Sequence, residues 1–158
     1  TLADLARLTD VFYIGGTKCG ALCGEAVVFP RGGMPRHFLT HAKQHGALLA
    51  KGRLLGVQFD TLFTDDLYGE VGRTAAAAAD ELRRILREAG CTFFRESPTN
   101  QQFVVLENAQ VEALAERIRF STWEKLGDGR TVIRLVTSWS TTPDDLAALE
   151  AALHEVMQ

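Results

Sequence analysis

The sequence predicts a fold between α/β and α+β, with a mainly antiparallel sheet in its second part. Three observations support this class. Short apolar runs at 11–14 and 25–29 flank a glycine-rich turn. An alanine-rich segment at 68–89 carries its apolar residues at helical spacing. Beyond it, strand-like segments are interleaved with helical ones. We therefore expect two parts, residues 1–60 and 61–158.

The first part is expected to begin with a short amphipathic stretch. Its two apolar runs are predicted to be short buried strands, one on each side of the turn. A long helical region is then predicted from about Arg36 to Phe63. Because Gly46, Gly52 and Gly56 interrupt this region, it either packs tightly against a neighbour or breaks.

The second part has clearer signals. Tyr68–Ala89 is predicted to be a helix that Gly90 caps, and the 142–145 sequence has the hydroxyl cap, early proline and acidic residue of a helix start. The remaining predicted elements are strands at 91–94 and 102–106, a helix from Ala109 to about Arg117 capped by Asn108, and a hairpin of 120–126 and 131–139 around Gly127-Asp128-Gly129.

Composition excludes several classes of function. The 158 residues are 46% hydrophobic and 23% charged, as in an ordinary globular protein. The net charge of -3 disfavours nucleic acid as a partner, and no apolar run approaches the length of a membrane span. The three cysteines are too few for a disulfide framework, so we expect a reduced, cytoplasmic setting.

Lys18 is the first candidate for chemistry. It lies in Gly15-Gly16-Thr17-Lys18-Cys19-Gly20, directly after an apolar strand. Glycines let the backbone approach a ligand closely, so this turn can hold an amine against an aldehyde or a phosphate. The amine must lose its proton to attack an aldehyde, and apolar surroundings favour that loss. The alternative is a solvated loop lysine. The spacing does not fit a phosphate-binding P-loop.

Arg134 is the second candidate. It lies in the apolar strand at 131–137, where both faces carry aliphatic side chains. A buried guanidinium needs an anion or several acceptors. It either binds a substrate carboxylate with both arms of its fork or forms an internal salt bridge, for instance with Glu25 or Glu124.

No metal site is expected. His37, His41 and His45 share one face of a helix at their spacing, but no zinc-protease pattern accompanies them, so a polar stripe is favoured. Cys19 and Cys23 have no second pair nearby, and we interpret them as small packed side chains.

Taken together, these segments resemble the threonine aldolases and β-eliminating lyases that depend on pyridoxal phosphate. The resemblance keeps its order over nearly the whole chain. The matching segments are Asp10–Gly20, Gly24–Phe29, Lys43–Arg53, Ser97–Gln101, Trp123-Glu124 and Ile133–Trp139.

The resemblance implies the tail of a fold-type-I cofactor domain followed by a small α+β domain. It implies a homodimer or homotetramer that binds pyridoxal 5'-phosphate and cleaves β-hydroxy-α-amino acids such as L-threonine to glycine and an aldehyde. Lys18 would be the Schiff-base lysine, and Thr17 would touch the cofactor phosphate. Arg134 would bind the substrate carboxylate, and Lys43 would reach a phosphate from the neighbouring subunit.

The resemblance also implies that an N-terminal part is missing, since intact members of the family carry additional sequence before the lysine strand. We therefore expect the C-terminal portion of an enzyme, inactive by itself. The alternatives are a β-eliminating or aminotransferase-like enzyme with the same cofactor, and a non-catalytic oligomerising fragment.

Overall fold

The computed structural model describes residues 1–157. The chain divides into two compact units, Thr1–Tyr68 and Gly69–Gln158. The assignment of residues 1–60 and 61–158 to a large and a small domain of an intact enzyme stays a prediction. The two units are described separately below.

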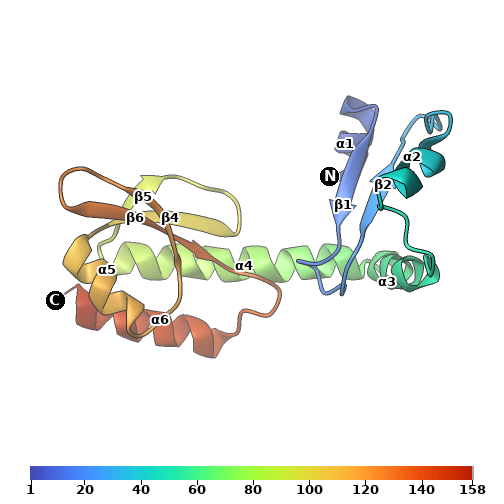
Figure 1. The fold of residues 1–158 in the computed structure, drawn as a ribbon. Coiled ribbons are helices and arrows are strands. Elements are labelled where there is room, and N and C mark those ends of the chain that lie inside the picture. Colours follow the sequence, from blue (N-terminus) through green and yellow to red (C-terminus); the bar gives the residue numbers. More distant parts are fainter. Residues whose placement is uncertain (158) are drawn as a thin grey trace. The chain divides into compact units, whose positions relative to one another are not determined.

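The first unit contains a two-stranded antiparallel sheet and short helices (Figure 1). Strands β1 and β2 pair from Phe12 opposite Val28 to Gly15 opposite Glu25. The prediction that both strands are buried is wrong, because Ile14 is their one fully buried residue. Two strands alone cannot enclose a core, so their other side chains stay accessible. The elements are α1 (Leu2–Leu8), β1 (Phe12–Gly15), β2 (Glu25–Val28), α2 (Phe38–Gln44), α3 (Arg53–Phe63) and the first residues of α4 (Leu67–Glu88).

Of the two outcomes expected for the helical region from Arg36 to Phe63, the break is the one that forms, since α2 and α3 are separate helices. The break is at Gly46, which has a φ of 71°. The Ala47 amide donates to the Ala42 carbonyl over 2.8 Å, a pairing typical of a helix that ends on a left-handed glycine. The sequence pattern marked this glycine as an interruption, and the structure shows that it ends the helix.

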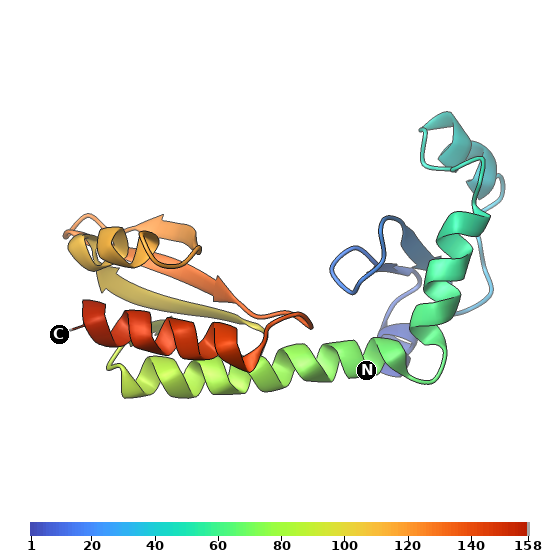
Figure 2. The same ribbon diagram turned by 90° about the horizontal axis from the view of Figure 1, so that it is seen from below.

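The second unit is a four-stranded antiparallel sheet with helices α4 and α6 side by side along one face (Figure 2). The strand order is β3-β4-β6-β5, so β6 is an interior strand. The predicted antiparallel sheet is thereby confirmed. The elements after α4 are β3 (Thr92–Arg95), β4 (Gln101–Glu107), α5 (Asn108–Ala115), β5 (Ser121–Lys125), β6 (Arg130–Val136) and α6 (Pro143–Val156).

The core of the second unit forms where this sheet meets its helices. Val104 and Leu106 of β4 and Ile133 and Leu135 of β6 point towards the helices. The apolar stripe predicted for the helix at 68–89 is confirmed. The two long helices supply Leu82, Ile85 and Leu86 from α4 and Leu146, Leu149 and Leu153 from α6, while Ala89 and Val156 pack at the edge of this cluster.

Local capping explains most of the helix ends in this unit. The Cys91 amide donates to the Leu86 carbonyl over 3.0 Å across Gly90, whose φ is 77°. Thr142 and Asp145 form the reciprocal box at the start of α6. The predicted Asn108 cap is wrong. Asn108 is the first residue of α5, and its side-chain oxygen accepts from the Thr131 hydroxyl over 2.8 Å.

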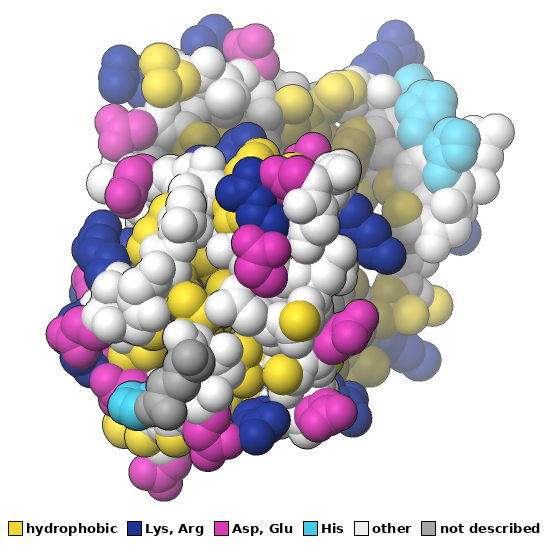
Figure 3. Space-filling model, turned by 90° about the vertical axis from the view of Figure 1, so that its left-hand side faces the viewer, with side chains coloured by type: hydrophobic (Ala, Val, Ile, Leu, Met, Phe, Trp, Pro, Cys, Tyr) yellow, Lys and Arg dark blue, Asp and Glu magenta, His cyan; other side chains and the backbone are white. Residues whose placement is uncertain are grey.

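Figure 3 shows acidic and basic side chains mixed on the face of the second unit near the C-terminus. The exposed ion pairs of this unit include Arg84–Glu81 and Arg117–Glu155. Among the described residues, no helix has the length and apolar character needed to traverse a lipid bilayer.

Candidate active site

The turn between β1 and β2 presents Lys18 at the surface. Gly16 starts it, with its amide donating to the Gly24 carbonyl over 3.3 Å, and its own carbonyl accepts from the Cys19 and Ala21 amides over 2.9 and 3.0 Å. Thr17 and Lys18 are exposed, and neither side chain has a hydrogen bond or ion pair within the described chain. The turn therefore offers a free amine beside a free hydroxyl.

Packing within this unit requires glycine at Gly16 but not at Gly15. A Cβ on Gly16 would lie 2.8 Å from the Ala21 Cβ and 3.1 Å from the Phe59 ring, so packing inside the unit requires glycine there. A Cβ on Gly15 would meet nothing within 4 Å. The Leu22 amide also donates to the Gln58 side-chain oxygen over 2.6 Å, which ties the end of the turn to α3.

Tyr68 packs near the same turn at the start of α4. Partial burial raises the pKa of its phenol, and the neighbouring Cys19 thiol adds to the increase. The Tyr68 ring lies 5.2 Å from the ring of Phe63. Tyr68 thus stays neutral at physiological pH and supports the turn on the side of Cys19. Tyr13 and Leu22 do not give Lys18 the apolar surroundings that would favour loss of its proton, because both side chains are exposed.

The other predicted residues of the first unit lie on or beside α2. Lys43 is exposed in the last turn of this helix. His41 is within α2, while His37 and His45 are the residues that cap its two ends, and His37 has a φ of 63°. No cluster of potential metal ligands occurs among the residues that the structure describes.

Arg134 lies on β6, half-buried among neutral partners. Its Nη1 donates to the Gln101 side-chain oxygen over 3.3 Å, and its Nη2 donates to the Ser121 hydroxyl over 3.4 Å. Its Cζ lies over the Trp123 ring, 5.8 Å from the centroid. Its buried Nε has no hydrogen-bond partner in the described chain. Within the described part of the second unit no carboxylate pairs with it, so the salt bridge considered with Glu124 is not formed.

Sequence reasoning gave no role to the three residues around Arg134. Gln101, Ser121 and Trp123 come from strands on both sides of β6, and only the register brings them together. The Ser121 Cα is opposite that of Arg134, and a bulge in β5 follows at Thr122/Glu124. Two sequence features would have indicated these neighbours if the strand pairing had been known. They are Gln101 at the start of β4 and the alternation of Ser121 and Trp123 in β5.

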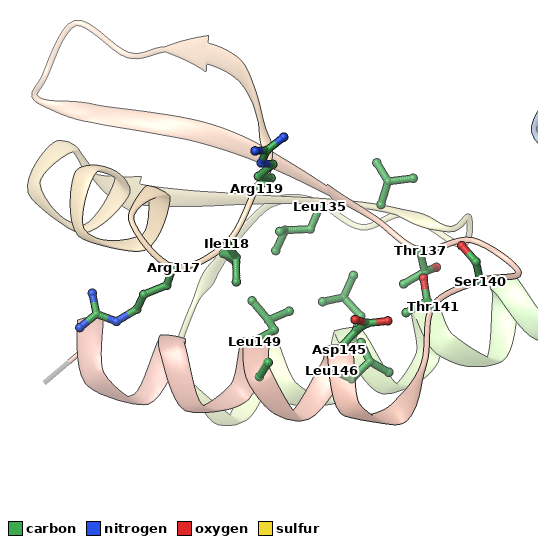
Figure 4. Close-up of a pocket in the computed structure, with 13 residues that line it drawn as sticks. Arg117, Ile118, Arg119, Leu135, Thr137, Ser140, Thr141, Asp145, Leu146 and Leu149 are labelled. Atoms are coloured by element: carbon green, nitrogen blue, oxygen red, sulfur yellow. The ribbon is translucent and has the colours of Figure 1, made fainter.

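The second unit and the first each have a hollow, and neither Lys18 nor Arg134 lines it. One, of about 450 Å³, is on the helix side of β6 (Figure 4). Three of its polar side chains have protein partners: Arg117 pairs with Glu155, Asp145 caps α6 and Thr137 donates to Ala75. The other, of about 750 Å³, lies in the first unit between Leu22 and α3 and is lined by apolar side chains such as Leu54 and Val57.

Comparison with known proteins gives a consistent assignment. The sequence is 29% identical over 150 residues to a low specificity L-threonine aldolase from Pseudomonas aeruginosa, and equally to one from another Pseudomonas strain. A solved threonine aldolase from Leishmania major superimposes with a TM-score of 0.92 and 39% identity over 100% of this chain. The chain is a relative of the threonine aldolases. No protein-family model matches the sequence.

The likeness covers only part of these threonine aldolases. The alignment spans 94% of this chain but 42% of the curated Pseudomonas relatives, and 46% of the Leishmania chain. This coverage agrees with the expected C-terminal portion of such an enzyme. A serine palmitoyltransferase from Sphingomonas wittichii matches with a TM-score of 0.62 and 13% identity, which shows a shared fold alone. The predicted fold class is confirmed by these matches.

Proposed function

We propose that the intact protein is a pyridoxal-phosphate-dependent aldolase that cleaves β-hydroxy-α-amino acids such as L-threonine to glycine and an aldehyde. The observation that carries this proposal is the likeness to enzymes named threonine aldolase over 94% of the chain or more. The free amine of Lys18 and the Arg134 guanidinium without a carboxylate partner in its unit support it.

In this proposal Lys18 holds the cofactor. Its side chain is exposed on a turn whose backbone is fixed by three hydrogen bonds from Gly16, Cys19 and Ala21. An amine and a hydroxyl on adjacent residues suit a ligand with both an aldehyde and a phosphate, so Lys18 would bind the aldehyde carbon and Thr17 the phosphate. We assign Lys43 to a phosphate of the neighbouring subunit. When bound, the cofactor acts as an electron sink for charge that develops on the substrate Cα.

Arg134 binds the substrate carboxylate. Its charge is not neutralised by any described carboxylate of its unit, and hydrogen bonds from guanidinium to neutral acceptors are weaker than those to a carboxylate. The Cα–Cβ bond of the substrate then breaks, the β-hydroxyl gives up its proton as it becomes the aldehyde carbonyl, and Cα takes up a proton. L-threonine is thereby converted to glycine and acetaldehyde with no other reactant.

The protein is further proposed to be a cytoplasmic homodimer or homotetramer that includes the N-terminal part absent from this sequence. The exposed apolar side chains of β1, β2 and α3 support a covered surface in the intact protein. Light scattering of the purified intact protein measures its assembly state.

The decisive experiment uses the intact protein with pyridoxal phosphate. Borohydride reduction followed by peptide mass spectrometry should place a pyridoxyl group on Lys18, while Lys18→Ala should carry none and the matched surface variant Lys51→Ala should be labelled normally. Incubation with L-threonine should give acetaldehyde and glycine. Formation of 2-oxobutyrate instead would favour the β-eliminating alternative, and a protein with no adduct on Lys18 would contradict the proposal.

A further inference from the structure

The guanidinium of Arg134 is held by groups from the two strands that flank β6. Gln101 of β4 and Ser121 of β5 accept from its two terminal nitrogens over 3.3 and 3.4 Å. Trp123 of β5 lies beneath its Cζ at 5.8 Å. Phe103 of β4, opposite Arg134 in the register, packs edge-on against Trp123 with 4.9 Å between the centroids.

All of these partners are neutral, and this has an electrostatic consequence. A neutral acceptor or an aromatic face restrains a guanidinium but leaves its positive charge available to an anion. A carboxylate at the same place would form a stronger, charge-assisted pair and compete with any incoming anion. Gln101 is the position where this distinction is sharpest, because glutamate has the same length and differs only in carrying the charge.

Arg134 is also half-buried, so the orientation of its side chain determines which of its nitrogens a ligand can contact. Side-chain entropy opposes holding a long arginine in one rotamer, and the two hydrogen bonds with the Trp123 contact offset that cost before a ligand arrives. Because Nε is buried, its terminal nitrogens are the atoms that a ligand can reach, and Gln101 engages one of them.

We propose that Gln101 is a positioning residue, which orients the Arg134 guanidinium over Trp123 for a substrate carboxylate without neutralising it. This inference rests on the proposed function, in which Arg134 binds that carboxylate. Gln101 acts through Arg134 and has no part in the bond-breaking step.

The test compares Gln101→Glu and Gln101→Ala with a charge control, Thr122→Glu, in the intact cofactor-loaded protein. Thr122 is exposed and lies opposite Ile133, one residue away from the Arg134 position in the register. The measurements are the dissociation constant of glycine by calorimetry, KM and kcat for L-threonine, cofactor content and the thermal midpoint.

Gln101→Glu should raise both the glycine dissociation constant and KM about tenfold or more, the equivalent of losing ~1.4 kcal/mol of binding. Its kcat, cofactor content and thermal midpoint should stay the same or, for the midpoint, increase, because the new carboxylate pairs with Arg134. Gln101→Ala should raise KM by a smaller factor, about threefold, since orientation is lost without competition. Thr122→Glu should change none of these values by more than about twofold.

The outcomes separate this inference from the proposed function. If Arg134→Gln leaves glycine binding unchanged, the proposed role of Arg134 is wrong. If Arg134→Gln weakens glycine binding but Gln101→Glu behaves like Thr122→Glu, the positioning role alone is wrong. A Gln101→Glu protein that loses cofactor, kcat and thermal stability together would also overturn it, because that pattern indicates a merely structural residue.

Discussion

The Thr137 hydroxyl donates a hydrogen bond to the Ala75 carbonyl oxygen over 2.8 Å, joining the end of β6 to α4. Thr137 is 2% exposed, and its backbone amide donates to the Asn100 carbonyl over 3.0 Å. This residue therefore fixes the strand that carries Arg134 against both a helix and the turn before β4.

Thr137→Val should destabilise the second unit by about 1 kcal/mol, because the isosteric side chain leaves the partly buried Ala75 carbonyl without the hydroxyl donor. Chemical denaturation of the intact protein measures the change. Thr137→Ser keeps the hydroxyl and should recover most of the hydrogen-bond contribution while losing a methyl group. Equal destabilisation by valine and serine would show that packing, and not the hydrogen bond, is what matters.

Gly16→Ala should disturb the turn that presents Lys18. The new Cβ would lie 2.8 Å from the Ala21 Cβ, and overpacking of this kind costs about 1–3 kcal/mol. We expect a lower thermal midpoint and a reduced content of reducible cofactor adduct on Lys18. Gly15→Ala is the matched control for the midpoint, since its Cβ meets nothing within 4 Å. Similar losses for both variants would contradict the packing argument.

The Cys91 thiol should be unreactive in the native protein. Burial raises its pKa to about 11, so at pH 8 only about one thiol in a thousand is ionised. Cys23 is exposed and serves as the internal comparison. Brief alkylation at pH 8 followed by mass spectrometry should label Cys23 and leave Cys91 free until the protein is unfolded. Rapid native labelling of Cys91 would show that the core of the second unit opens readily.

The start of α6 should respond to acid. Hydrogen bonds from the Thr142 backbone amide and hydroxyl lower the pKa of Asp145. A carboxyl whose pKa is lower in the folded state stabilises the fold above its unfolded pKa, and this contribution is lost as the pH falls through the folded value. Asp145→Asn should therefore be less stable than the parent at pH 7, and the difference should shrink below about pH 4. A difference that is constant with pH would exclude this charge effect.

The elements of the second unit could be predicted because their signals are local. The spacing of Leu82, Ile85 and Leu86, the cap formed by Thr142 and Asp145, and the glycine turn before Arg130 each depend on a few neighbouring residues. The predicted Asn108 cap does not form because the Asn108 side chain has a competing partner, Thr131, 23 residues further along the chain.

The first unit was harder to predict for a physical reason. Apolar residues at 11–14 and 25–29 predicted buried strands, but burial depends on what covers a sheet and not on the strands alone. The glycines at 46, 52 and 56 indicated a break as one of two outcomes for the helical region. Its position was not predicted, because a pattern of apolar residues does not encode the left-handed conformation of Gly46.

The candidate site was predictable only in part. Lys18 could be identified because its sequence predicts a strand followed by a glycine-rich turn. Arg134 could be identified because it is a charged residue within an apolar strand. Gln101 and Trp123 depend on strand order and register, which join residues from β4 and β5 across β6. No local pattern specifies that pairing.

The uneven distribution of buried apolar side chains has a consequence for dynamics. Ile14 and Leu62 are the fully buried large apolar residues of the described first unit, whereas the second has a continuous interior. Slow hydrogen–deuterium exchange in this chain should accordingly be confined to α4, β4, β6 and α6. Proteases should cleave first between β2 and α3. The protease-resistant fragment would contain the second unit and would be suitable for nuclear magnetic resonance.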